Sequence, residues 1–102
     1  MADAAGMTER QLQECVRQLC RLLGCLYWHA HDSRHSPAGF PDCVIVTKDR
    51  RIIFSELKSA TGKLTPPQVQ WLLWLREGGA ETHVWRPAQW LDGTIERAIK
   101  GA

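Results

Sequence analysis

The stretch GFPDCVIVTKDRRIIFSELK, residues 39–58, predicts a β-hairpin around which the rest of the chain is arranged. Its two apolar runs, VIV and IIF, are continuous enough to be central strands of a sheet, and a charged Lys-Asp-Arg turn separates them. Folding the chain about this turn pairs Thr47 with Arg51. This pairing sets the register of every residue further along both strands.

Three charged side chains meet at the open end of this hairpin. The register places Asp42 opposite Glu56, and side chains on a strand alternate between its faces. Glu56 and Lys58 therefore point the same way, and Leu57 points the other. Two carboxylates and the backbone carbonyl of Leu57 suit Mg²⁺ or Mn²⁺, and a bound cation would activate a water that Lys58 can orient or help deprotonate. The alternative is an ordinary charged surface cluster.

The order of these residues resembles the motif of the PD-(D/E)XK nuclease superfamily. HDSRHSPAGFPD at residues 31–42, SELK at 55–58 and LTPPQ at 64–68 are similar to its VRR-NUC branch, most closely to small stand-alone, often phage-encoded members. The similarity runs from about Thr8 to Trp90. It implies a metal-dependent phosphodiester hydrolase in which in-line displacement leaves a 5′-phosphate and a 3′-hydroxyl.

The pattern along the whole chain predicts an α/β (α+β) fold in the order α-β-β-β-α-β-α. A mixed sheet is flanked by helices, and the resemblance implies a restriction-endonuclease-like core. We expect residues 1–7 to be a flexible N-terminus and residues 8–102 to be a single domain. The expected helices run from Thr8 to Gly24, from Thr65 to Gly78 and, more weakly, from about Ala88 to Lys100, and the expected strands are 25–30, 42–47, 51–58 and 82–86.

Glu9 and Glu14 on the first helix compete to be a further metal ligand. Measured as rotation about the helix axis from Leu12, the apolar stripe centres at about 10°. Glu9 lies at about 60°, at the edge of the stripe, and Glu14 lies at about 200° and faces solvent. The family pattern is similar, because a Glu at the start of the first helix commonly completes the metal site, with a Gln four residues on, here Gln13. We expect Glu9 to contribute directly or through water. The other interpretation is an acid that only complements the helix dipole.

Further candidates flank the carboxylates. Gln68 begins the second helix, and the resemblance implies that it supports the active site or contacts the substrate backbone, although helix capping alone would explain it. The loops before Asp42 and after Lys58 hold donors that suit phosphates flanking the cleavage point, and a solvated loop would look similar. These DNA-contact candidates are Ser33, Arg34, His35, Ser36 and Lys63.

The second helix is apolar around most of its circumference, because Gln70 is the one polar residue in the stretch 69–75. A helix of this kind is buried on more than one side. In so small a domain we expect one side to face the sheet and the other a second copy, in a two-fold homodimer that uses Trp71 or Trp74. The alternative is coverage by the C-terminal segment with Trp90.

Composition restricts the remaining function classes. The net charge is only +2, so nucleic-acid binding would have to use local clusters such as Lys48, Arg50 and Arg51. No apolar run approaches the ~18 residues of a membrane span, and the N-terminus does not resemble a signal peptide. The four cysteines lack a Cys-x-x-Cys pair, which favours core packing in a reducing cytoplasm over zinc or a disulfide. His29 and His31 lack the partners of a zinc or HNH-type site.

These observations together favour a DNA endonuclease of a bacterial or phage-infected cytoplasm. No recognition helix or zinc finger is evident, so we expect DNA to be recognised by shape and backbone. Stand-alone VRR-NUC proteins resemble Holliday-junction resolvases, and a dimer could nick such branched DNA twice. A broader flap or nicking endonuclease in repair or replication is the alternative. A non-cleaving DNA-binding accessory protein would have lost Asp42, Glu56 or Lys58, and a protein-interaction module would leave them idle.

Overall fold

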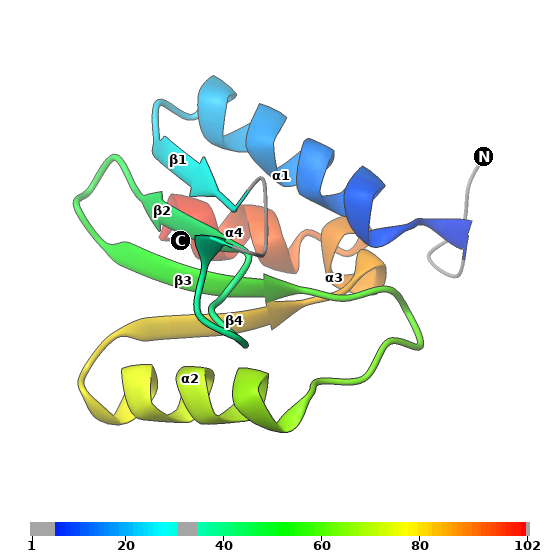
Figure 1. Cartoon of the computed structure of the whole chain (residues 1–102). Helices are drawn as coiled ribbons and strands as arrows, with labels where there is room; N and C mark the ends of the chain where they lie inside the picture. The colour runs from blue at the N-terminus through cyan, green and yellow to red at the C-terminus, as the bar shows by residue number, and fades with distance from the viewer. Residues whose placement is uncertain (1–5, 31–34, 102) are drawn as a thin grey trace.

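A four-stranded sheet with helices on both sides makes up the computed structural model, which describes residues 6–30 and 35–101 (Figure 1). The strands lie in the order β1-β2-β3-β4; the first two pairs are antiparallel, and β3 and β4 are parallel. The predicted mixed sheet is confirmed. The elements are α1 (Glu9–Leu22), β1 (Leu26–His29), β2 (Cys43–Val46), β3 (Ile52–Leu57), α2 (Pro66–Glu77), β4 (Glu81–Trp85), α3 (Pro87–Leu91) and α4 (Thr94–Lys100).

The β2–β3 hairpin has the predicted register. The Thr47 N–H donates to the Arg51 carbonyl at 2.9 Å, and Arg50 takes the left-handed φ of 70° that closes the turn. Four positions further along, Cys43 lies opposite Ser55. The next residues outward on the two strands are the two carboxylates predicted to face each other.

One face of the sheet is covered by α1 and α4. The helix α1 begins at a capping box, in which the Thr8 hydroxyl accepts from the Gln11 N–H and the Gln11 side chain accepts from the Thr8 N–H. Met7 packs against the same core, and residues 1–5 of the N-terminal segment lie outside the described part of the chain. All four cysteines are free thiols. The core consists of Leu12, Val16, Leu19, Cys20, Cys43, Ile45, Ile53, Leu57, Trp85, Ile95 and Ile99.

The C-terminal segment forms two short helices where one was predicted. Gly93 adopts a left-handed φ of 85°, and the Asp92 side chain accepts from the Thr94 N–H at 2.9 Å, so the chain turns between α3 and α4. Trp90 of α3 packs against the core with α1 and α4. No helix in residues 6–30 or 35–101 is long and apolar enough to cross a membrane.

The opposite face of the sheet, here called the open face, is only partly covered. The helix α2 packs along β4 at one side of it (Figure 1), and Leu72 is its one buried residue. Within the single chain α2 is buried on one side only, because Trp74 is 66% exposed, and the second copy expected on its other side stays a prediction. Since Trp90 belongs to the other face, the C-terminal segment does not cover α2 either.

Candidate active site

Two carboxylates meet on the open face at the end of the hairpin. Asp42 Oδ2 accepts a hydrogen bond from the Leu57 N–H at 2.8 Å, which ties the residue just before β2 to the end of β3. Glu56 is only 2% exposed, although a carboxylate is among the most costly side chains to bury. The side chains of Asp42 and Glu56 are within hydrogen-bonding reach of each other, so the structure brings them together as predicted.

Gln68 joins this pair to the second helix. Its Nε2 donates to Glu56 Oε2 at 3.2 Å, and its Oε1 accepts from the Thr65 N–H at 2.9 Å. The two roles weighed for Gln68, helix capping and support of the site, are thus both present in one side chain. The Thr65 hydroxyl completes the cap by accepting from the Gln68 N–H.

The second oxygen of Glu56 is chemically unsatisfied. Glu56 Oε1 is buried, and no group in the described part of the chain donates to it. Burial, a hydrogen bond to Asp42 and the charges of Asp42 and Glu9 raise the pKa of Glu56 from 4.5 to about 9, against the opposing charge of Lys58. Without a cation, Glu56 therefore favours its protonated form at neutral pH. A divalent cation would supply the positive charge that this oxygen lacks, so the donors fit a hard metal ion.

Glu9 lies near the pair but is exposed at the first residue of α1. Its charge contributes to the raised pKa of Glu56. In the described ranges, no three His, Cys, Asp or Glu side chains are gathered closely enough to hold a metal ion by themselves. A cation at this site would therefore use two carboxylates, a carbonyl, water and substrate oxygens, which is typical of Mg²⁺. Of the two predicted contributions of Glu9, the one through water fits this geometry.

Lys58 continues the sheet beyond β3 and is only 8% exposed. Its N–H donates to the Trp85 carbonyl at 3.0 Å. The loop that follows is held by Arg86, whose Nη1 donates to the Ser59 carbonyl at 2.8 Å and the Gly62 carbonyl at 2.7 Å. Sequence reasoning missed Arg86, because only the parallel pairing of β3 with β4 brings it beside the loop after Lys58.

The loop before Asp42 is fastened to the start of α2. Gly39 has a φ of 85°, and a Cβ at this position would lie 2.4 Å from the Pro67 carbonyl carbon and 2.7 Å from the Gln68 nitrogen. Trp71 Nε1 donates to the Ala38 carbonyl at 3.1 Å, and the Trp71 ring packs edge-on against Phe40, with centroids 5.2 Å apart. Trp71, predicted for a dimer interface, is thus partly used within its own chain.

The loop candidates for DNA contact are less defined. His35 is exposed, Ser36 is half-buried, and Lys63 is exposed on the loop after Lys58. Ser33 and Arg34 lie outside the described residues, as does His31.

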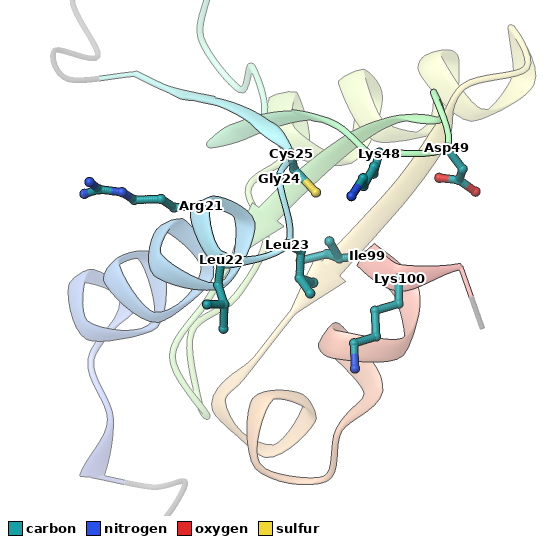
Figure 2. Close-up of a pocket in the computed structure, with 9 residues that line it drawn as sticks. All are labelled: Arg21, Leu22, Leu23, Gly24, Cys25, Lys48, Asp49, Ile99 and Lys100. Carbon is teal, nitrogen blue, oxygen red and sulfur yellow. The ribbon is translucent and has the colours of Figure 1, made fainter.

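A hollow of about 630 Å³ lies at the other end of the sheet, between the ends of α1 and α4 and the hairpin turn. Figure 2 shows the Lys48 amine and the Cys25 thiol pointing into it, with Arg21 and Lys100 extending away. Because the hairpin turn is the end opposite the two carboxylates, this hollow is not part of the candidate active site.

The pH dependence of stability should report the raised pKa of Glu56. Because the folded chain keeps a proton that the unfolded chain releases, this contribution is fully present below about pH 4.5 and is lost as the pH rises through 9. We expect the melting temperature in EDTA to fall over this range more steeply for the wild type than for Glu56→Gln. Added Mg²⁺ should stabilise the wild type more at pH 9 than at pH 6, since the cation competes with the proton. Equal slopes for both proteins in EDTA would contradict the raised pKa.

Comparison with known proteins identifies a family and a shared fold. The chain matches the VRR-NUC domain family model over residues 3–89. Two solved structures share the fold. One, described as a VRR_NUC domain, is 24% identical and covers 88% of this chain and 97% of its own, with a TM-score of 0.72. The other, a VRR_NUC domain protein, is 19% identical. The match covers 94% of this chain and 91% of that one, with a TM-score of 0.71. A search of curated proteins gave no match. Since the family model spans most of its length, this chain belongs to the VRR-NUC domain family.

Proposed function

We propose that this nuclease-type, DNA-processing domain is a divalent-metal-dependent, structure-specific endonuclease that cuts branched DNA such as Holliday junctions as a homodimer. The observation that carries the proposal is the buried Glu56 Oε1, which has no donor among the described residues and lies in a carboxyl group beside Asp42. Burying two interacting carboxylates is unfavourable unless a cation or a proton joins them. In a phosphodiester hydrolase, that cation would activate the attacking water and stabilise charge on the scissile phosphate.

The side chains around the pair have distinct roles in this proposal. Asp42, Glu56 and the Leu57 carbonyl would hold Mg²⁺ or Mn²⁺, with Glu9 acting through water. When bound, the ion lowers the pKa of a bound water and stabilises negative charge on the scissile phosphate. Gln68 keeps Glu56 in place through its amide. Lys58, almost fully buried and close enough to oppose the pKa rise of Glu56, orients the attacking water or offsets charge at the phosphate.

The exposed side of α2 supports the homodimer. Val69 is 47%, Leu73 48% and Trp74 66% exposed, which leaves an apolar strip on the outer surface of the helix. Strips of this kind are common where two copies of a chain meet. A two-fold dimer would present two active sites, as paired nicks in a four-way junction require. Sizing chromatography of the wild type and of Trp74→Glu should show a dimer and a monomer respectively.

The substrate is tested by incubating the purified chain with end-labelled four-way, flap and linear duplex DNA, with Mg²⁺, with Mn²⁺ or with EDTA. We expect symmetric paired cuts in the four-way junction, little cutting of the linear duplex, and none in EDTA. Cutting of the flap in preference to the junction would replace the proposed substrate. Binding to every substrate with no cleavage under either metal would indicate a DNA-binding accessory protein.

One observation favours a second candidate, a flap or nicking endonuclease in repair or replication. Asp42, Glu56, Lys58 and Gln68 all come from a single chain, so the site does not need a partner to be complete. A monomer in solution that leaves single nicks would select this candidate.

A further inference from the structure

An exposed tryptophan lies beside the proposed active site and has no part in the mechanism described so far. Trp28 is on the edge strand β1, pairs with Val44 and is 48% exposed. Asp42 lies two residues before Val44, and the Ala30 N–H, two residues after Trp28, donates to the Asp42 carbonyl at 3.3 Å. Side chains two apart share a face, so the indole and the Asp42 carboxylate both lie on the open face, separated along the strand by about 7 Å.

The indole is held in a defined position. Phe40, which is separated from Asp42 by a single proline, packs edge-on against Trp28 with ring centroids 6.2 Å apart. On its other side Phe40 packs edge-on against Phe54, with centroids 6.4 Å apart. An exposed ring that is fixed by its neighbours loses little side-chain entropy when a ligand stacks on it.

The surroundings of Trp28 are cationic as well as aromatic. A hollow of about 520 Å³ at the edge of β1 is lined by Trp28 together with Arg17 and Arg21 of α1. Arg17 is occupied by an ion pair with Glu14. Figure 2 shows the Arg21 guanidinium extending away from the hollow near Lys48, and Arg21 has no ion pair in the described part of the chain. An aromatic face beside a guanidinium matches the chemistry of a nucleotide, with one group for the base and one for the phosphate.

We propose that Trp28 and Arg21 form a subsite for an unstacked nucleotide of the DNA strand that is cut. Inside duplex DNA both faces of each base are covered by stacked neighbours, so an indole can accept a base only where stacking is interrupted, in an unpaired strand or at the open centre of a branch point. The subsite would therefore select DNA with an unstacked or unpaired base next to the scissile phosphate, at a branch point or a flap. This inference rests on the proposed function, and it adds the structural feature by which branched DNA is recognised.

The test is a binding measurement without cleavage. Fluorescence anisotropy in EDTA gives the affinity of the full chain for a labelled thymine-only single strand and for a blunt duplex of equal length. We expect Trp28→Leu to weaken single-strand binding about tenfold, while duplex binding changes less than about twofold. Trp28→Phe should retain most of the affinity, because it keeps an aromatic face. Arg21→Gln should reduce the slope of log affinity against log salt by about 0.7 on the single strand, as loss of one phosphate contact predicts.

Leu26→Ala is the matched control, because Leu26 is on the same strand and face, is 71% exposed and has no ring. It should leave both affinities unchanged. Equal loss on single strand and duplex in Trp28→Leu, or no loss, would overturn the subsite. So would conversion of a dimer to a monomer by this substitution, which would assign the surface to a second copy of the chain.

The binding result and the cleavage result separate the two proposals. Single-strand binding that depends on Trp28, in a protein that cuts no DNA with either metal, would retain the subsite and reject the endonuclease. Metal-dependent cutting with binding that is indifferent to Trp28 would retain the endonuclease and reject the subsite.

Discussion

Replacing Asp42 with Asn is expected to lower the rate of DNA cleavage on the order of 1,000-fold while DNA binding persists. The amide oxygen can still accept from the Leu57 N–H, so the hairpin end should keep its structure. What is lost is the negative charge that, with Glu56, would hold a divalent cation. Single-turnover cleavage of labelled branched DNA in Mg²⁺, with binding measured in EDTA, separates the two effects.

The matched control for this substitution is Asp49→Asn. Asp49 is an exposed carboxylate at the other end of the same hairpin, hydrogen-bonded to Thr47 and Arg51. It should leave cleavage within about twofold of the wild type. Lys58→Ala is expected to resemble Asp42→Asn, with cutting lost and binding retained. Undiminished cleavage by Asp42→Asn would remove the metal site from the proposal.

The second large effect is expected from Gly39→Ala, and it concerns stability. The new methyl group would overlap the Pro67 carbonyl carbon at 2.4 Å, and the residue would keep an unfavourable φ of 85°. Left-handed backbone costs a residue with a Cβ about 1 kcal/mol, and overpacking adds about 1–3 kcal/mol. For a domain of this size the melting temperature should fall by roughly 10–25 °C. The start of α2 should also move away from the loop, which would pull Gln68 from Glu56 and slow cleavage.

Gly79→Ala separates the two causes of this destabilisation. Gly79 has a φ of 95°, but a Cβ there would meet nothing within 4 Å. It should therefore lose about 1 kcal/mol from the backbone conformation alone. Calorimetry on both variants gives the difference, which measures the close approach of the loop to α2. Equal melting temperatures for the two variants would show that this contact contributes nothing.

Local sequence patterns were sufficient for the hairpin and the carboxylate pair. The turn between the two apolar runs determined which residues face each other, and the alternation of side chains then placed Glu56 and Lys58 on one face. Helical periodicity likewise separated Glu9 from Glu14. The charge of Glu9 contributes to the raised pKa of Glu56.

Long-range contacts account for what the sequence did not reveal. Arg86 is 27 and 24 positions from the two loop carbonyls it holds, and Gly39 meets Pro67 only because the loop folds back over α2. Neither relation has a local period that could be read from neighbouring residues. The break between α3 and α4 did have a local signal, the Asp92-Gly93 pair, since Asp-Gly is typical of turns.

The double attachment of Gln68 limits which residue can occupy this position. At the third residue of a helix, Gln and Glu are usually interchangeable, because either can accept from the N–H of the capping residue. Here the far end of the same side chain must donate to Glu56 Oε2, which a carboxylate cannot do. Glutamate would keep the helix start intact while adding another negative charge beside a pair that already resists ionisation. Glutamine and glutamate are equivalent at this position in most helices, but at position 68 only glutamine satisfies both contacts.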